Sequence, residues 1–133
     1  MIILDTHVLI WWLQEDGRRL SAVAQEAIDA EQVGGTILLS AITAWEVALL
    51  VSKGRLGVGS DIIVWLDKVM AKPFIRFVHI DPAIAIAAVN LPGTLHHDPA
   101  DRIIVATARH LGATLITADA KLLAYPHVET LAA

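Results

Sequence analysis

The residues of this chain that could do chemistry are mainly acids. Asp5, Glu46, Asp101 and Asp119 are far apart along the sequence, yet each occupies a position from which it could reach a shared site. Carboxylate oxygens bind hard divalent cations, and bound cations activate water and neutralise developing negative charge. We therefore predict that these four acids form a metal-binding cluster.

Two of these acids follow predicted strands. Asp5 ends the apolar run Ile2 to Asp5, and Asp119 comes shortly after the run Ala113 to Thr117. In open α/β sheets the ligand crevice lies at the carboxyl ends of the strands, so the two acids can meet there. The alternative is that each acid only caps the helix that follows it.

Glu46 lies on a mostly apolar face of a predicted helix over Ala41 to Lys53. Its neighbours one turn away are Ile42, Thr43, Leu49 and Leu50. An unpaired buried carboxylate costs several kcal/mol or takes up a proton, so Glu46 needs a cation or a set of donors. We predict that it is a metal ligand, with a water-exposed rim position as the alternative.

The segment His96-His97-Asp98-Pro99-Ala100-Asp101-Arg102 is the densest group of reactive side chains. Asp98 before Pro99 is an N-cap pattern, which places Asp101 in the first helical turn. The similar pair Asp81-Pro82 has no acid at the corresponding position, so capping alone does not explain Asp101. We assign Asp98 chiefly to the cap, Asp101 to the metal, and Arg102 to a phosphate or to Asp98.

The sequence argues against a zinc site. No cysteine is present, which excludes disulfides, thiolate ligands and thiol catalysis. Of the six histidines, only His96 and His97 adjoin another good ligand, and adjacent residues rarely bind one tetrahedral ion together. His97 could instead touch a substrate phosphate, the alternative being a solvated loop side chain.

The elements that must position these residues alternate between strands and helices. Strands are predicted at Ile2 to Asp5, Thr36 to Leu39, Ile75 to Ile80, Ala113 to Thr117 and near Val128. Helices are predicted at Thr6 to Gln14, Ser21 to Gln32, Ala41 to Lys53, Asp61 to Ala71, Pro82 to Leu91, Pro99 to Leu111 and Ala120 to Ala124. Short strands that are apolar on both faces favour a mainly parallel sheet covered on both sides, a three-layer α/β/α sandwich. No linker interrupts residues 1–133, which we expect to form a single domain.

Composition limits the remaining possibilities. The hydrophobic fraction is 56%, with a mean hydropathy of +0.60, which is more apolar surface than a small core hides and favours a partner interface. The longest apolar run, Thr36 to Ser52, contains Glu46 and is not expected to span a membrane, and no signal peptide is recognised, so a cytoplasmic location is expected. The formal net charge of −4 argues against a broad basic surface and equals the charge of four carboxylates.

Four motifs in order resemble the PIN-domain family over nearly the whole chain. They are Ile3-Leu4-Asp5-Thr6-His7, Ser40-x-x-Thr43-x-x-Glu46, His97-Asp98-Pro99-Ala100-Asp101-Arg102 and Thr117-Ala118-Asp119. More narrowly, the chain resembles the VapC-type toxins of bacterial toxin-antitoxin pairs. The resemblance implies a PIN-like fold, metal-site acids at Asp5, Glu46, Asp101 and Asp119, Asp98 as an accessory acid and Thr6 near the site. The sequence departs from the family pattern around Asp119, where a larger residue often follows.

The resemblance also implies an activity and partners. The expected activity is endoribonuclease cleavage of RNA with Mg²⁺, or Mn²⁺, as cofactor. Asp5 and Asp101 would bind the main ion, while Glu46 and Asp119 would orient its waters or hold a second ion. A homodimer and a VapB-like antitoxin are implied as partners. The bases Arg18, Arg19, Lys53, Arg55 and Lys72 are scattered, and while most are expected to be solvated, some are available to guide RNA.

Two other functions fit parts of the pattern. A haloacid-dehalogenase-like phosphatase also places an Asp after its first strand, but it requires a second Asp where this chain has His7. No suitable lysine follows a later strand either. The other alternative is a non-catalytic α/β module that binds a partner and uses its acids only as caps and in ion pairs.

Overall fold

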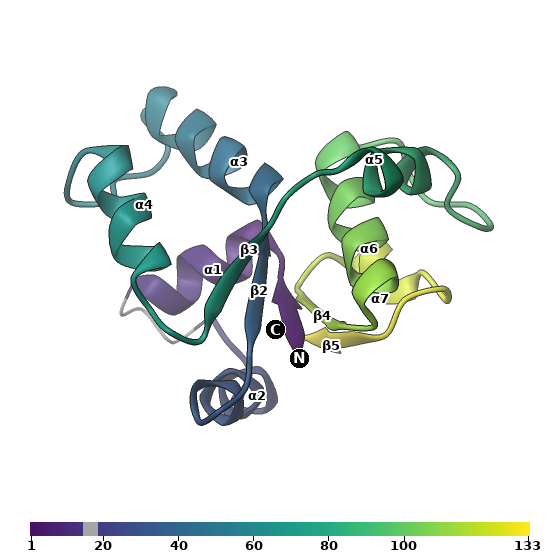
Figure 1. Ribbon diagram of the computed structural model, residues 1–133, viewed down its shortest axis with the longest axis horizontal. Coiled ribbons are helices and arrows are strands. Elements are labelled where there is room, and N and C mark those ends of the chain that lie inside the picture. The colour runs from purple at the N-terminus through teal and green to yellow at the C-terminus, as the bar shows by residue number, and fades with distance from the viewer. Residues whose placement is uncertain (15–18) are drawn as a thin grey trace.

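The computed structural model describes residues 1–14 and 19–133, so Arg18 lies outside the described residues. The strands are β1 (Ile2–Leu4), β2 (Ile37–Ser40), β3 (Ile75–Val78), β4 (Thr114–Thr117) and β5 (Thr130–Ala132). The helices are α1 (Thr6–Leu13), α2 (Ala22–Gln32), α3 (Ala41–Ser52), α4 (Ile62–Met70), α5 (Pro82–Val89), α6 (Pro99–Leu111) and α7 (Ala120–Ala124). Each predicted strand and helix is present, with ends that differ by a few residues (Figure 1).

The strands form one five-stranded sheet in the order β3-β2-β1-β4-β5. Every pairing is parallel. The first strand of the chain is therefore the central one, and in the register of the sheet its Ile3 lies beside Leu38 of β2 and Leu115 of β4. This arrangement brings the carboxyl ends of β1, β2 and β4 next to one another.

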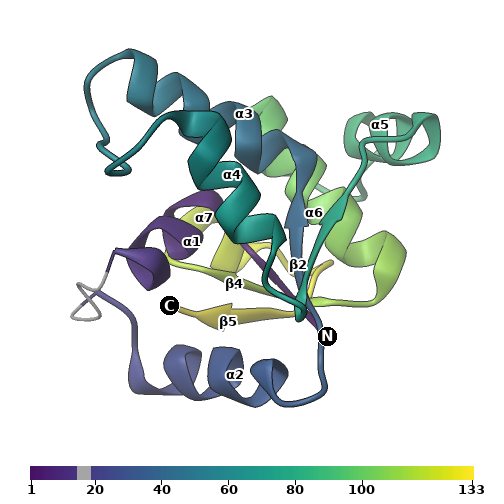
Figure 2. The same cartoon turned by 60° about the vertical axis from the view of Figure 1, so that its left-hand side comes forward.

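Alternate residues of the strands feed two separate hydrophobic cores. Ile3, Leu38 and Leu115 pack into one core together with apolar residues of α5, α6 and α7. Leu4 and Ile116 belong to the other core, which is closed by residues of α1, α2 and α4. The strands are apolar on both faces because each face is covered by helices, and the predicted three-layer α/β/α sandwich is confirmed (Figure 1, Figure 2).

Helix α3 connects the two helical layers at the edge where the strands end. It follows β2 without a loop, begins at the cap residue Ser40, and contacts α1, α4 and α6 (Figure 1). A residue on the inner face of α3 therefore lies close to the starts of α1 and α6. Among the described residues, no helix has both the length and the hydropathy needed to cross a bilayer.

Candidate active site

Asp5 lies at the carboxyl end of the central strand and is only 8% exposed. Its backbone N–H donates to the carbonyl of Ile116 at 3.0 Å, which holds the residue against β4. Its Oδ1 accepts from the N–H of Thr6 at 2.8 Å, so it caps α1, and its Oδ2 accepts from the hydroxyl of Thr117 at 2.8 Å. Burial raises the pKa of Asp5, these two donors oppose that rise, and nearby Asp119 adds to it.

Asp119 reaches the same edge from β4. Its backbone N–H donates to the Thr117 hydroxyl at 3.1 Å, so one threonine links Asp5 to the turn that carries Asp119. The Oδ1 of Asp119 accepts from the N–H of Lys121 at 2.7 Å and caps α7. The capping interpretation is therefore correct for both Asp5 and Asp119, and it coexists with their position at the shared edge.

Glu46 approaches from α3 and is half-buried. Its Oε1 accepts from the hydroxyl of Thr6 at 2.5 Å. The Thr6 and Thr43 hydroxyl oxygens are 3.1 Å apart. Since the Thr6 proton is given to Glu46, Thr43 is the donor of this second bond. Burial raises the pKa of Glu46 most, and the charges of Asp5 and Asp101 raise it further.

Asp101 lies in the first turn of α6, as the sequence predicts. The Oδ1 of Asp98 accepts from the Asp101 N–H at 3.0 Å, which confirms Asp98 as the N-cap of α6. The Oδ2 of Asp101 is 2.7 Å from Nε2 of His96. Burial is the main cause of a raised pKa at Asp101, and the charges of Asp5, Asp98 and Asp119 contribute, while the His96 contact opposes it.

The His96 ring has a defined tautomer. Its Nδ1 is buried and has no hydrogen-bond partner in the described part of the chain. A proton on Nδ1 would be a buried donor without an acceptor, whereas a proton on Nε2 is donated directly to Asp101. The geometry therefore favours Nε2 as the nitrogen that donates to Asp101. Sequence reasoning considered His96 only as a zinc ligand and missed this contact.

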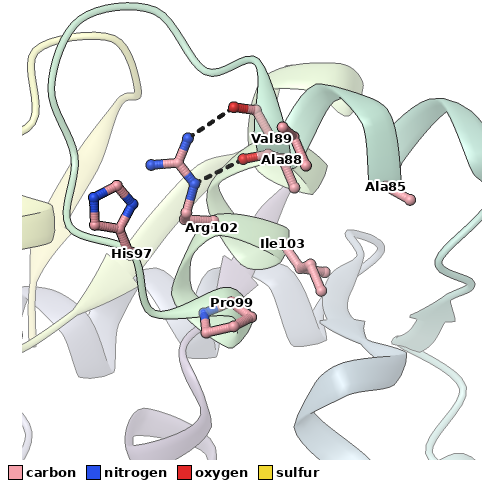
Figure 3. Close-up of a pocket in the computed structure, with 7 residues that line it drawn as sticks. All are labelled: Ala85, Ala88, Val89, His97, Pro99, Arg102 and Ile103. Atoms are coloured by element: carbon pink, nitrogen blue, oxygen red, sulfur yellow. Dashed lines mark hydrogen bonds between the residues drawn. The ribbon is translucent and has the colours of Figure 1, made fainter.

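Arg102 does not contact Asp98, and this corrects one of its two predicted contacts. Its guanidinium donates to the carbonyls of Ala88 at 2.8 Å, Leu95 at 2.9 Å, Val89 at 3.1 Å and His96 at 3.4 Å. Figure 3 shows the bonds to Ala88 and Val89. The end of α5 presents unpaired carbonyls that match the donors of a guanidinium, while the Asp98 carboxylate is already occupied by the start of α6. Arg102 thus ties the segment that carries His96 to α5 and α6.

His97 is exposed and points away from α6 in the loop that precedes it (Figure 3). With Pro99, Arg102 and Ile103 it lines a largely apolar hollow of about 480 Å³ between α5 and α6. The predicted contact of His97 with a substrate phosphate stays a prediction.

The four predicted acids converge, although they come from four different elements of the chain. Asp119 raises the pKa of Asp5 and of Asp101, and both Asp5 and Asp101 raise the pKa of Glu46. These influences act between carboxylates that face the same carboxyl edge of the sheet. We call Asp5, Glu46, Asp101 and Asp119 the acidic cluster.

Comparisons with known proteins agree with this geometry. The family model described as PIN domain matches residues 2–128. The chain belongs to the PIN-domain family. It is 36% identical over 126 residues to Ribonuclease VapC22 of Mycobacterium tuberculosis (strain ATCC 25618 / H37Rv), a match that covers 95% of this chain and 92% of that protein. PIN-domain membership removes the haloacid-dehalogenase alternative.

Solved structures share the PIN fold. VapBC2 from Rickettsia felis, bound to a DNA fragment from its promoter, matches with a TM-score of 0.74 at 17% identity, covering 100% of this chain and 99% of that one. FitAcB from Neisseria gonorrhoeae matches with a TM-score of 0.68 at 22% identity, covering 98% of this chain and 96% of that one. At these identities the likeness concerns the fold alone.

The donor chemistry of this PIN site fits a hard cation. Asp101 Oδ1, Glu46 Oε2 and Asp119 Oδ2 accept no hydrogen bond from residues 1–14 and 19–133. Within the same ranges no three His, Asp or Glu side chains are close enough to form a preformed cage. Mg²⁺ keeps several of its waters and is commonly held by one or two protein carboxylates. A site whose carboxylates do not form a closed cage therefore suits this ion.

Thr43 and Thr117 are further members of the PIN site that sequence reasoning did not assign. Thr43 was noted only as part of a motif, and Thr117 only as the end of a strand and the first residue of a motif. Their roles depend on which elements are neighbours. The hydroxyl of Thr117 reaches Asp5 because β4 pairs with β1, and Thr43 reaches Thr6 because α3 contacts α1.

Proposed function

We propose that this PIN domain is a metal-dependent endoribonuclease that acts as the VapC-type toxin of a toxin-antitoxin pair. The observation that carries the proposal is the acidic cluster at the carboxyl edge of the sheet. Asp5 and Glu46 are held by neutral hydroxyl and amide donors, so their charge remains available to a cation, and Asp101 accepts one bond from His96. The relative that is 36% identical is named as a ribonuclease, Ribonuclease VapC22, which supports this proposal.

The proposed mechanism divides the acids into two pairs. Asp5 and Asp101 hold the main ion, which we propose to be Mg²⁺, with Mn²⁺ as a substitute. Glu46 and Asp119 orient waters at this ion or hold a second one. When bound, the metal lowers the pKa of a water and neutralises charge on the scissile phosphate. The expected products have 5'-phosphate and 3'-hydroxyl ends.

Neighbouring side chains orient the acids for these roles. Thr117 fixes one oxygen of Asp5, Thr6 fixes one oxygen of Glu46, and His96 fixes one oxygen of Asp101. The second carboxylate oxygen of Glu46 and that of Asp101 are left for the ion or its waters. Asp98 sets the position of Asp101 through its backbone N–H and acts as an accessory residue.

The proposal is tested by sequencing RNA 5'-phosphate ends in cells after induced expression. Wild type should produce new ends, and Asp101→Ala should reduce them at least about tenfold because a ligand of the main ion is lost. Asp81→Ala is the control, since it also removes a carboxylate at the start of a helix, the cap of α5, but lies outside the acidic cluster. A folded Asp101→Ala variant that keeps more than a tenth of the activity would contradict the proposal.

The alternative of a non-catalytic binding module has one specific observation in its favour. Asp5, Asp98 and Asp119 all serve as helix caps, a role that needs no metal. Titration of Mg²⁺ and Mn²⁺ against wild type and Asp5→Ala/Asp101→Ala separates the two functions. Binding that is lost in the variant supports the nuclease, and equal or absent binding supports the module.

A VapB-like antitoxin and a second copy of the chain are the proposed protein partners. The solved relatives include complexes described as VapBC and as a toxin-antitoxin complex, from Klebsiella pneumoniae. Large apolar side chains are exposed on this chain at Trp45 of α3, Ile63 of α4 and Ile86 and Val89 of α5. We propose that these exposed apolar side chains contribute to the sites for an antitoxin and for a second copy.

A further inference from the structure

A groove of about 510 Å³ lies beside the acidic cluster and has no role in the hydrolysis proposed above. It runs between α1 and the end of α3, on the side of the molecule where α1, α3 and α4 gather (Figure 1, Figure 2). Its walls carry His7, Trp11, Arg19, Leu50, Arg55 and Leu56. We call these residues the α1 groove.

One end of the α1 groove adjoins the acids. His7 follows Asp5 and Thr6 directly in the chain, lies in the first turn of α1 and is exposed. Trp11 lies one turn further along α1, with its ring centroid 6.4 Å from that of His7. A ligand in the groove would therefore continue into the acidic cluster.

The walls of the groove combine cations with an aromatic surface. The guanidinium carbon of Arg19 is 5.8 Å from the ring centroid of Trp11. Arg55 lines the same groove from the segment after α3, where its backbone N–H donates to the carbonyl of Leu50 at 2.9 Å. Both arginines are exposed. The groove thus places two guanidiniums and an indole next to a site that is otherwise negative.

This combination matches the chemistry of a single nucleic-acid strand. Guanidiniums bind phosphate oxygens through paired donors, and aromatic rings stack on bases. Leu50 and Leu56 add apolar wall on which a base or ribose can pack. A duplex would not present its bases to Trp11, since they are stacked inside the helix.

We infer that the α1 groove binds the single-stranded RNA that flanks the cleaved phosphate. One base stacks on Trp11 while backbone phosphates lie against Arg19 and Arg55. The inference rests on the proposed ribonuclease function and deepens it by assigning the substrate a path. Because every base has a stacking face, the groove selects single-stranded RNA rather than a particular sequence.

Binding of a fluorescently labelled single-stranded oligoribonucleotide tests the groove without cleavage. The full chain carries Asp101→Ala as the common background, with Mg²⁺ present. Arg19→Ala/Arg55→Ala should weaken binding about tenfold or more. It should also make the slope of log Kd against log salt concentration shallower, by the amount expected for the loss of about one to two phosphate contacts. Arg76→Ala is the matched control, because Arg76 is an exposed arginine on β3 outside the groove, and it should bind like the background.

Trp11→Phe provides a second variant that keeps an aromatic ring in the partly buried position. It should bind more tightly than Trp11→Leu, because only the aromatic ring stacks on a base. Either of two results would overturn the inference. One is equal affinity of Trp11→Phe and Trp11→Leu for the RNA. The other is binding by Arg19→Ala/Arg55→Ala within about twofold of the background, with an unchanged salt dependence.

Cleavage kinetics in the otherwise wild-type chain separate failure of the groove from failure of the nuclease. Arg19→Ala/Arg55→Ala should raise KM about tenfold and change kcat little, because the groove holds flanking RNA and not the reacting atoms. If wild type cleaves RNA and the variant keeps its KM, the groove is wrong and the nuclease stands. If wild type cleaves no RNA, the proposed function fails, while the binding assay still decides the groove. If Arg19→Ala/Arg55→Ala loses affinity for an antitoxin peptide but binds RNA like the background, the groove is a protein-binding site instead.

Discussion

At the scale of single residues, the acids of the cluster are held by hydrogen-bond donors from side chains and helix starts. Thr6 and Thr117 supply hydroxyls, His96 supplies an imidazole N–H, and the helix starts supply amides. None of these donors cancels a full negative charge, so burial and mutual repulsion raise the pKa values of Asp5, Glu46 and Asp101. A cation bound among these carboxylates would offset their mutual repulsion.

The first prediction concerns the pH dependence of stability. At a pH between the ordinary pKa of a carboxyl group and its raised pKa in the fold, the folded protein binds more protons than the unfolded chain. The free energy of unfolding therefore falls as pH rises through this window. Asp101→Asn removes one of the repelling charges. It should raise the free energy of unfolding in EDTA at neutral pH, by about 1 kcal/mol or less since the site is partly solvated.

Urea unfolding of wild type and Asp101→Asn between about pH 3 and pH 8, a range that begins below the ordinary carboxyl pKa, measures this effect. The two curves should converge towards the acidic end, where the Asp101 carboxyl of wild type takes up its proton. A variant that is less stable than wild type at neutral pH, or a constant difference across the range, would show that repulsion at Asp101 is not the cause.

The second prediction concerns His96, which donates to Asp101 through Nε2. Groups that hold a metal-binding carboxylate commonly contribute tenfold or more to metal affinity. His96→Asn cannot place an N–H at this position and should weaken Mn²⁺ binding about tenfold. His96→Gln carries an amide nitrogen at nearly the distance of Nε2 and should retain most of the affinity.

Calorimetric titration with Mn²⁺ compares the two variants, and circular dichroism checks that both are folded. Equal affinities of His96→Asn and His96→Gln would show that the Nε2 contact does not position Asp101.

At the scale of elements, three helix starts meet at one edge of the sheet. Asp5, Asp98 and Asp119 cap α1, α6 and α7, so each helix begins at the acidic cluster. The parallel sheet produces this arrangement for α1 and α7, because they follow β1 and β4 at the edge where these strands end. Helix α6 follows α5 instead, and its packing against α5 and α3 brings its start to the same edge. Capping and metal binding are compatible, since a carboxylate can accept a backbone N–H and still offer lone pairs to an ion.

The third prediction separates capping from activity. Asp98→Ala and Asp81→Ala each remove an N-cap carboxylate before a proline, and each should lower the free energy of unfolding by about 1 kcal/mol. Only Asp98→Ala should also reduce metal-dependent RNA cleavage, because Asp98 positions Asp101. Denaturant melts and cleavage assays on the same samples test both parts. Equal activity of the two variants would confine Asp98 to capping.

The sequence predicted the elements well, but it did not predict their neighbours. Apolar periodicity and cap residues were enough to locate α3 and α6, and therefore to place Glu46 and Asp101 on helices. The order of the strands depends on nonlocal packing, which no local pattern records. For this reason the contact from Thr117 to Asp5 and the contact from His96 to Asp101 were not anticipated, and Arg102 was assigned the wrong acidic partner.

At the scale of the whole molecule, the excess of apolar residues becomes exposed surface in defined places. Ile86 and Val89 of α5 are 63% and 75% exposed, beside the hollow between α5 and α6. Trp45 of α3 is 58% exposed. Exposed side chains of this size cost free energy in water, and burial against another protein chain recovers it.

The fourth prediction assigns α5 to the proposed homodimer. Light scattering should give a dimer for wild type and a monomer for Ile86→Lys/Val89→Lys, because two lysines would have to lose their hydration in the interface. Ile63→Lys/Val64→Lys is the matched control on α4 and should remain a dimer. A monomeric wild type, or a dimer that survives the α5 change, would contradict this assignment.

By itself, the sequence determined the alternation of strands and helices and singled out the four acids of the proposed site, because apolar period, cap residues and charge are properties of short segments. The tertiary structure alone decided what these acids touch. The pairing of β1 with β4 brings Thr117 to Asp5, and the packing of α5 against α6 holds the loop that carries His96. Such contacts arise from the cooperative burial of two cores, to which residues distant along the chain contribute together.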